Sequence, residues 1–417
     1  MTSAAPSLAA STPAATLPAR LLSLDAYRGF VMLAMASRGF GIPKVAALPQ
    51  FASHPTWQFL AGQLDHVAWV GSCFWDLIQP SFMFMVGVAM AYSCAARVSK
   101  GDPYWKMLLH AIFRAMVLIA LGVFLRSNSS DQTNFTFMDV TSQIGLGYLP
   151  LFLLWGRKFW VQATAAIVIL VGYFALFALY PLPAADYNYA AVGVDENWVH
   201  FQGFQRHWEK NANVAHDVDV KVLNWFPRPE PFMFDRGGYN TLNFIPSIAT
   251  MIFGLIAGEW LRGGASGLKK FGILVGAGLA MLLIGWGLNE LGVCPVVKRI
   301  WTPSWAIYST GWTCLLLAAF YGVIELIQFR FWAFPLVVIG MNSIAIYCMD
   351  KLCHSWTLKT LKTHLGWKIE KLRTFPAIDK LVSDSQIYLP IIETTAVLLI
   401  FWLVLLWMYR RRIFLRI

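Results

Sequence analysis

Residues 62–92 read GQLDHVAWVGSCFWDLIQPSFMFMVGVAMAY, and this stretch decides both the fold and the place of the chemistry. It opens on a polar, aromatic loop that carries Asp65 and His66, and continues into an apolar segment that still holds Asp76 and Gln79. A charge inside a membrane-length apolar run is costly and usually serves function. A neutral imidazole beside the membrane is suited to act as a general base. The stretch therefore predicts a reaction centre at the end of a membrane-spanning helix.

The composition of the whole chain indicates a polytopic membrane protein. Of its 417 residues, 58% are hydrophobic and 13% are charged, whereas soluble proteins average about 25% charged residues. The net charge of +11 is typical of cytoplasmic Lys and Arg anchors, and we expect no nucleic-acid binding. Residues 1–19 are rich in Ala, Ser, Thr and Pro and lack the pattern of a secretory signal peptide, which predicts a disordered cytoplasmic tail.

The apolar segments predict an all-α protein with about ten transmembrane helices, since each approaches the roughly 20 residues that cross a bilayer. Lys and Arg gather in alternate connections, which places both termini in the cytoplasm. We expect one transmembrane domain, residues 20–417, with a large extracytoplasmic loop at 181–240. The expected helical segments are 24–42, 72–96, 107–126, 141–156, 160–180, 241–262, 268–289, 304–326, 332–353 and 388–409.

The long loop at 181–240 is rich in aromatic residues. Such loops are often lids or binding loops, and aromatic rings suit the apolar faces of sugars. An interfacial aromatic belt explains the same composition, and both interpretations stay open. His200, His207 and His216 lie in this loop, but their spacing is not that of zinc ligands. The sequence therefore predicts no metal site.

The sharpest local candidate for chemistry is the pair Asp65–His66. A carboxylate near an imidazole can fix its tautomer and raise its basicity. Adjacent side chains often point apart, so Asp76 is the other candidate partner, and a solvated, inert histidine is the third interpretation. Asp76 and Gln79 lie just before Pro80, which interrupts the helix and frees backbone carbonyls, as happens where a helix lines a cavity.

A second motif lies at the inner end of the first apolar segment. Asp25 and Arg28 stand at i, i+3 on one helix and can pair there. Such a pair can be a structural clasp, a contact with an anionic donor, or a cytoplasmic anchor with its partner.

Several blocks occur together in an order that is familiar from one family. They are LLSLDAYRGFVML, DHVAWVGSCFWDLIQPSFMFMVGVAM, FIPSIATMIFGLIAGEWLR, KRIWTPSWAIYSTGW, VIGMNSIAIY and YRRRIFLRI. The set resembles the heparan-α-glucosaminide N-acetyltransferase family of transmembrane acyltransferases and its bacterial relatives. The resemblance touches nearly every apolar segment but covers poorly the loop at 181–240 and the region 355–387.

The resemblance implies transfer of an acetyl group from cytosolic acetyl-CoA to an amino sugar across the membrane. It places the family's catalytic histidine at His66 and its aspartate at Asp76. The chain departs from the family at Ala36-Ser37-Arg38-Gly39, where relatives carry an asparagine. A glycosaminoglycan acceptor is therefore not assumed, and the expected acceptor is an amino sugar or another extracytoplasmic glycan.

The expected mechanism uses His66 to remove a proton from the acceptor as it attacks the thioester. A covalent acyl-histidine route is the alternative. We expect Asp65, Gln79, Trp69 and Trp75 to bind substrate. The Gln79 amide or the Ser72 hydroxyl is expected to stabilise the oxyanion that forms at the thioester carbonyl. Basic side chains on the cytoplasmic side are expected to hold the phosphates of acyl-CoA. They are Arg28, Arg97, Lys100, Arg157, Lys158, Lys269 and Lys270.

Two other functions fit the same residues. A transporter or flippase would use the break at Asp76 and Pro80 as a binding site, although no internal repeat is evident. If the protein is a non-catalytic scaffold or sensor, the His66 loop has no direct role in its function. Short loops and the lack of a signal peptide favour a multi-pass protein of a bacterial inner membrane. The sequence leaves homo-oligomerisation open.

Overall fold

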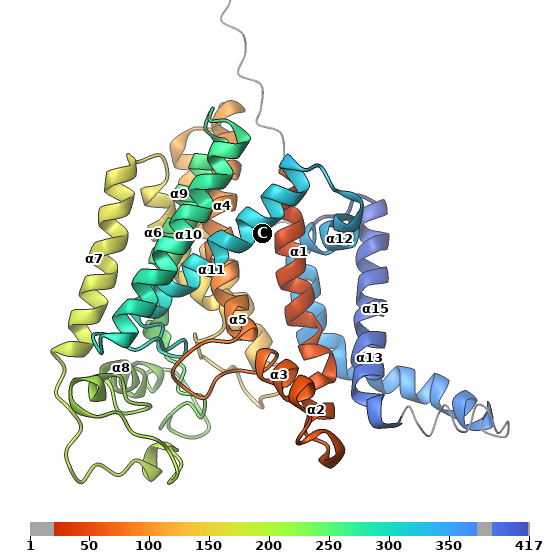
Figure 1. Cartoon of the computed structure of the whole chain (residues 1–417), viewed down its shortest axis with the longest axis horizontal. Coiled ribbons are helices and arrows are strands. Elements are labelled where there is room, and N and C mark those ends of the chain that lie inside the picture. The colour runs from red at the N-terminus through yellow and green to blue at the C-terminus, as the bar shows by residue number, and fades with distance from the viewer. Residues whose placement is uncertain (1–20, 373–385, 416–417) are drawn as a thin grey trace, which may run out of the picture.

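The computed structural model describes residues 21–372 and 386–415, and this part of the chain is helical and contains no β-strand. Long helices stand side by side, and short helices and loops gather at one end of the bundle (Figure 1). We call residues 37–73, 181–243 and 291–302 the cap. The elements of the bundle are α1 Leu22–Ala36, α4 Ile78–Ser99, α5 Tyr104–Ser127, α6 Val140–Leu154, α7 Phe159–Ala178, α9 Phe244–Arg262, α10 Gly267–Glu290, α11 Pro303–Tyr321, α12 Phe334–Gly340, α13 Ser343–Leu372 and α15 Leu389–Arg410.

The cap contains the shorter elements between these helices. They are η1 Arg38–Gly41, α2 Ile42–Ala46, η2 Pro49–Phe51, α3 Pro55–Gln63, η4 Ala190–Val192, η5 Gly203–Trp208, α8 Val214–Leu223 and η6 Thr241–Asn243, and η3 Phe74–Leu77 leads from the cap into α4. At the opposite end of the bundle, α11 continues into the π-turn Gly322–Leu326 and η8 Phe331–Ala333 precedes α12, whereas η9 Gln386–Tyr388 precedes α15.

Within residues 21–372 and 386–415, seven helical segments are long and apolar enough to cross a membrane, or eight if the bent pair α12–α13 counts as one span. The chain is thus an all-helical integral membrane protein, but the predicted number of about ten spans is not confirmed. A helix does lie in each predicted segment. Two of them, α1 and α6, have 15 residues each and are shorter than a straight span of roughly 20 residues.

The first helix ends early because the chain turns left-handed directly after it. Arg38, Gly39, Phe40 and Gly41 have φ values of 47°, 66°, 51° and 69°, a region that non-glycine residues rarely adopt. The turn sends the chain into α2 and α3 instead of continuing α1 to residue 42. The predicted tail, residues 1–19, lies outside the described residues.

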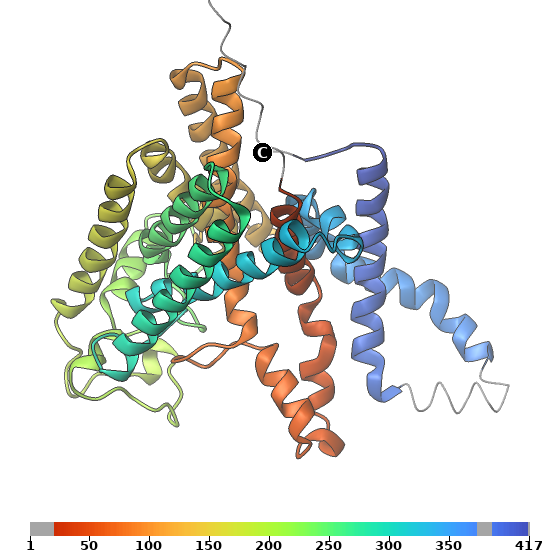
Figure 2. The same ribbon diagram turned by 45° about the horizontal axis from the view of Figure 1, so that its top comes forward.

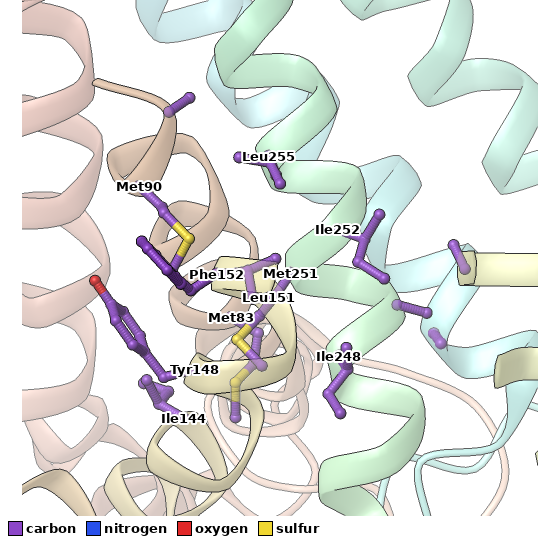
Figure 3. Close-up of a cluster of buried hydrophobic side chains, with 14 of the residues drawn as sticks. Met83, Met90, Ile144, Tyr148, Leu151, Phe152, Ile248, Met251, Ile252 and Leu255 are labelled. Carbon is purple, nitrogen blue, oxygen red and sulfur yellow. The ribbon is translucent and has the colours of Figure 1, made fainter. Parts of the chain in front are cut away.

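Glycines let two pairs of helices approach at backbone distance. A Cβ added to Gly87 in α4 would lie 1.9 Å from the Met251 carbonyl oxygen of α9, and one added to Gly29 in α1 would lie 1.8 Å from the Leu336 carbonyl oxygen of α12. Small residues at such contacts are the usual basis of helix packing in membranes. Between α4, α6 and α9 the core is filled by side chains that include Met83, Met90, Leu151 and Met251 (Figure 3).

The loop at 181–240 is an ordered part of the cap that packs beneath the bundle (Figure 2). Its Trp208 is fully buried in an apolar cluster with Phe177 of α7, Trp69, and Val297 and Ile300 of the segment before α11. At least part of its aromatic content therefore forms a small core that holds the cap on the bundle.

Candidate active site

The His66 loop folds back onto η3, so that the imidazole meets a buried carboxylate. The His66 Nδ1 atom lies 2.7 Å from the Asp76 Oδ1 atom. The side chain of His66 is 35% exposed, whereas that of Asp76 is 1% exposed. Within the described part of the chain, Nε2 of His66 has no hydrogen-bond partner. The ring thus turns one nitrogen inward and leaves the other available to a ligand.

Backbone and thiol donors hold the second oxygen of the Asp76 carboxylate. Its Oδ2 atom accepts from the Cys73 thiol at 3.1 Å, the Cys73 amide at 3.3 Å and the Val67 amide at 3.4 Å. Burial raises the pKa of Cys73 to about 11, so its sulfur stays a protonated donor. A carboxylate with this many donors has one orientation and stays ionised, which in turn fixes the imidazole.

A buried lysine completes the cluster, and the sequence interpretation missed it. The Lys298 Nζ atom lies 3.1 Å from Asp76 Oδ1 and 3.1 Å from His66 Nδ1. The side chain of Lys298 is only 4% exposed, and burial lowers its pKa. One signal was present, because a lysine and an arginine in a short loop predicted to be extracytoplasmic run against the positive-inside rule.

The segment that carries Lys298 is joined directly to the His66 loop. Val70 and Val297 form an antiparallel bridge, and the Gly71 amide donates to the Val296 carbonyl at 2.9 Å. Arg299 donates to the Val67 carbonyl at 3.2 Å. These contacts place the ammonium group against the imidazole although the two residues are 232 positions apart.

Asp65, the other candidate partner of His66, does not orient the ring. Its carboxylate accepts from the backbone amide of His66 at 2.7 Å, and its carbonyl oxygen shares the single proton of the Cys73 thiol with Asp76 Oδ2. Asp65 is exposed and shapes the loop. Of the two carboxylates that the sequence left open, Asp76 is the one that meets the imidazole.

The remaining residues expected to bind substrate take different places. Trp69 is 5% exposed and donates its indole N–H to the Trp208 carbonyl at 3.0 Å, so it ties the His66 loop to the cap. Trp75 and Gln79 are half-buried near the start of α4. The ring of Trp198 stands edge-on to Trp69.

A cavity of about 660 Å³ opens among α1, α4, α5, α6 and the α12–α13 junction. Three of the basic residues expected to bind acyl-CoA line it, namely Arg28, Arg97 and Lys100. Two further polar residues that the sequence interpretation missed, His110 and Arg114, also line it. The other four expected cations are not in its wall, and they are Arg157, Lys158, Lys269 and Lys270.

The cavity does not reach the catalytic candidates. Neither His66 nor Asp76 lines it, and the wall residue of α4 nearest in sequence to Asp76 is Phe82. Phe82 follows Asp76 by six positions, which corresponds to about 9 Å along a helix. The cavity wall also contains methionines, which adapt readily to a ligand's shape; they are Met32, Met85, Met90, Met107 and Met341.

Two arginines of the cavity wall have defined neighbours. Arg28 lies 3.7 Å from Asp25, as the i, i+3 spacing predicts. The guanidinium of Arg114 stands over the Tyr148 ring at 4.9 Å from its centroid, and its Nε is buried without a hydrogen-bond partner among the described residues. A buried donor of this kind is costly unless a ligand or water accepts from it.

No family model matches the chain. Over 397 residues the chain is 22% identical to a human protein named heparan-alpha-glucosaminide N-acetyltransferase, and the alignment covers 84% of this chain and 56% of the human protein. The chain therefore spans about half the length of the curated relative that it matches. Across residues 21–372 and 386–415, no group of three or more His, Cys, Asp or Glu residues is arranged to hold a metal ion. The membrane helices and this similarity together indicate a distant relationship to a protein named as an N-acetyltransferase.

Proposed function

We propose that this protein is a membrane acyltransferase that moves an acetyl group from acetyl-CoA to an amino sugar or another glycan acceptor across the membrane. The observation that carries the proposal is the His66–Asp76 pair. A buried carboxylate holds one ring nitrogen, and the other nitrogen is free to take a proton. A general base oriented in this way is what acyl transfer to an amine or hydroxyl requires.

The cavity fits the donor of the same reaction. Arg28, Arg97, Lys100 and Arg114 can neutralise the phosphates of acetyl-CoA at one end. The narrow pantetheine arm then follows the apolar wall along α4 towards Phe82. We take the protein to have about ten spans in a bacterial inner membrane, with both termini in the cytoplasm. The end of the cavity that carries the basic residues then opens to the cytoplasm, and the cap lies on the extracytoplasmic side.

The proposed chemistry balances with the groups at hand. The acceptor nitrogen or oxygen forms a bond to the thioester carbonyl carbon, while Nε2 of His66 takes its proton. The carbon–sulfur bond then breaks, and the imidazolium returns the proton to the CoA thiolate. Asp76 stabilises the imidazolium in between, because its carboxylate accepts the Nδ1–H bond at 2.7 Å. The cap, with Trp198 half-buried near the loop, supplies a surface for the sugar.

The test is turnover of acetyl-CoA by purified protein in lipid nanodiscs, offered a panel of amino sugars and measured as free CoA thiol. Saturable release with one acceptor, lost in His66→Ala, supports the proposal. His54→Ala is the matched control, since His54 is an exposed histidine of the same cap and should leave turnover unchanged.

A second measurement distinguishes the two routes and the competing function. Acetyl-CoA is mixed with protein without acceptor and free CoA thiol is followed by stopped flow; a burst of about one thiol per protein, lost in His66→Ala, indicates the covalent route. If no acyl-CoA binds to folded protein, the acyltransferase proposal fails. Uptake of a polar solute that depends on an ion gradient would then favour a transporter.

A further inference from the structure

We propose that Lys298 is a positioning residue that balances the charge of Asp76, the carboxylate that holds the imidazole of His66. The inference rests on the proposed function for its catalytic consequence, but not for its geometry. Three atoms from distant parts of the chain form a triangle, namely His66 Nδ1, Asp76 Oδ1 and Lys298 Nζ, with sides of 2.7, 3.1 and 3.1 Å.

The triangle selects one tautomer of the imidazole. An ammonium group has donors only, so it cannot accept a hydrogen bond from Nδ1–H. Its hydrogens can go to the Asp76 oxygen, which also receives the shorter bond from His66 Nδ1. With the carboxylate as shared acceptor, the proton stays on Nδ1 and the lone pair lies on Nε2, the nitrogen that faces a ligand. If Lys298 donated to Nδ1 instead, Nε2 would carry the proton and could not act as a base.

The same triangle balances charge. A carboxylate that is 1% exposed and had no cation beside it would favour the imidazolium form of its neighbour, and a charge at this range moves a titration by about 1–3 pH units. The ammonium of Lys298 lies as close to the imidazole as to the carboxylate and opposes that pull. The ammonium thus offsets the attraction of the carboxylate for a second proton on the ring.

The other ionisable groups around the imidazole do not touch it. Asp65 binds the His66 amide, Arg299 binds the Val67 carbonyl, and the Cys73 thiol binds Asp76 and a backbone carbonyl. Within the described residues, Lys298 is thus the cation that contacts the pair. It has little freedom to leave, because the Val297 amide on its N-terminal side bonds to Thr302 at 3.0 Å and its own side chain is buried.

The experiment measures the reactivity of His66 itself, so it does not depend on catalysis. Diethyl pyrocarbonate modifies neutral imidazole, and peptide mass spectrometry reports the modified fraction of His66 across pH. In Lys298→Met the midpoint should rise by at least about one pH unit. Lys298→Arg should restore it towards the original value. Asp76→Asn, which removes the opposite charge, should lower it.

Activity gives the second readout. In K298M the acid limb of the pH profile of kcat/KM should also move up by about one pH unit. At a fixed pH on that limb, kcat/KM should therefore fall about tenfold. Lys210→Met is the matched control, because Lys210 is a half-buried cation of the cap that stands over the Trp198 ring and does not contact the pair. It should leave the modification midpoint within about 0.3 pH units.

The outcomes separate the two proposals. A midpoint in K298M that stays in place or falls overturns the role of Lys298, even if acyl transfer is fully established. A midpoint that rises, in a protein that transfers no acyl group, supports the triangle and sinks the proposed function. If K298M does not fold, Lys298→Gln is measured in its place, and a fall in D76N must still be seen for the inference to stand.

Discussion

The cap and the cavity are built in opposite ways. At the cap, the carboxylate of Asp76 accepts hydrogen bonds at both oxygens, and a buried lysine closes the cluster. Around the cavity, a space of about 660 Å³ is bordered by adaptable methionines, and Arg114 has a buried nitrogen that no described residue hydrogen-bonds. The cluster at the cap is thus organised in advance for proton transfer. The cavity inside the bundle is left open for a large, charged ligand.

The largest expected effect comes from removing the base at the cap. His66→Ala should lower kcat by about 10³-fold, within the range of roughly 10²–10⁴ for loss of a positioned base. Steady-state CoA release checks the value, with the affinity for acetyl-CoA measured separately. Since His66 does not line the cavity, that affinity should stay within about twofold. A large loss of binding would contradict the separation of the two ends.

A somewhat smaller loss should follow when the carboxylate is neutralised. Asp76→Asn keeps the shape of the side chain but leaves Lys298 buried without its counter-charge. We expect kcat to fall about 10²-fold, together with a destabilisation on the order of 3–5 kcal/mol. Thermal unfolding in nanodiscs measures the second quantity. In the double variant with Lys298→Met, part of the stability should return while activity stays low.

Substitutions in the cavity wall should change the KM for acetyl-CoA rather than kcat. Arg114→Gln and Arg97→Gln should each raise the KM for acetyl-CoA about tenfold, since a charge-assisted hydrogen bond contributes about 1.5–3 kcal/mol. Their kcat should change little. Lys269→Gln is the control, because Lys269 was expected to bind the donor but does not line the cavity. An equal effect of K269Q would show that the donor binds elsewhere.

The smallest effect concerns the cap away from the site. Asp219 is fully buried, and burial raises its pKa to about 6. Because the unfolded value is about 3.9, the folded state holds this proton more tightly, and stability falls as pH rises from about 4 to about 6. The stability lost over this pH range is at most about 3 kcal/mol, since a pKa shift of one unit corresponds to about 1.4 kcal/mol.

Asp219→Asn should remove that part of the pH dependence, with stability measured by denaturant unfolding at pH 4 and pH 7. Asp186→Asn, at an exposed position of the same cap, is the control. If wild type and D219N lose the same stability between these pH values, the burial argument for Asp219 is wrong.

Local pattern predicted much of this architecture. The apolar segments indicated where the helices lie, because only helices satisfy the backbone in lipid. Asp76 was recognised as costly inside an apolar run, and His66 stands ten positions before it, close enough for one loop to join them. The early end of α1 was missed because four left-handed residues follow it, two of them not glycine.

Other features depend on contacts between distant segments. Lys298 meets His66 across 232 residues through a bridge of one residue pair, and no local pattern encodes such a contact. Arg114 sits in the middle of an apolar helix, and its role follows only from the packing of α5 beside α6. The aromatic residues of the loop at 181–240 were predicted to form a binding loop or a membrane-interface belt, and the burial of Trp208 shows that some of them form a core instead.

The glycine contact between α4 and α9 has a consequence for biogenesis. Gly87 leaves the ribosome long before Gly254, so α4 must enter the membrane with its close-packing face still unmatched. The counter-charge of Asp76 arrives later again, at Lys298. A nascent chain released before that point would hold an uncompensated carboxylate at the membrane edge.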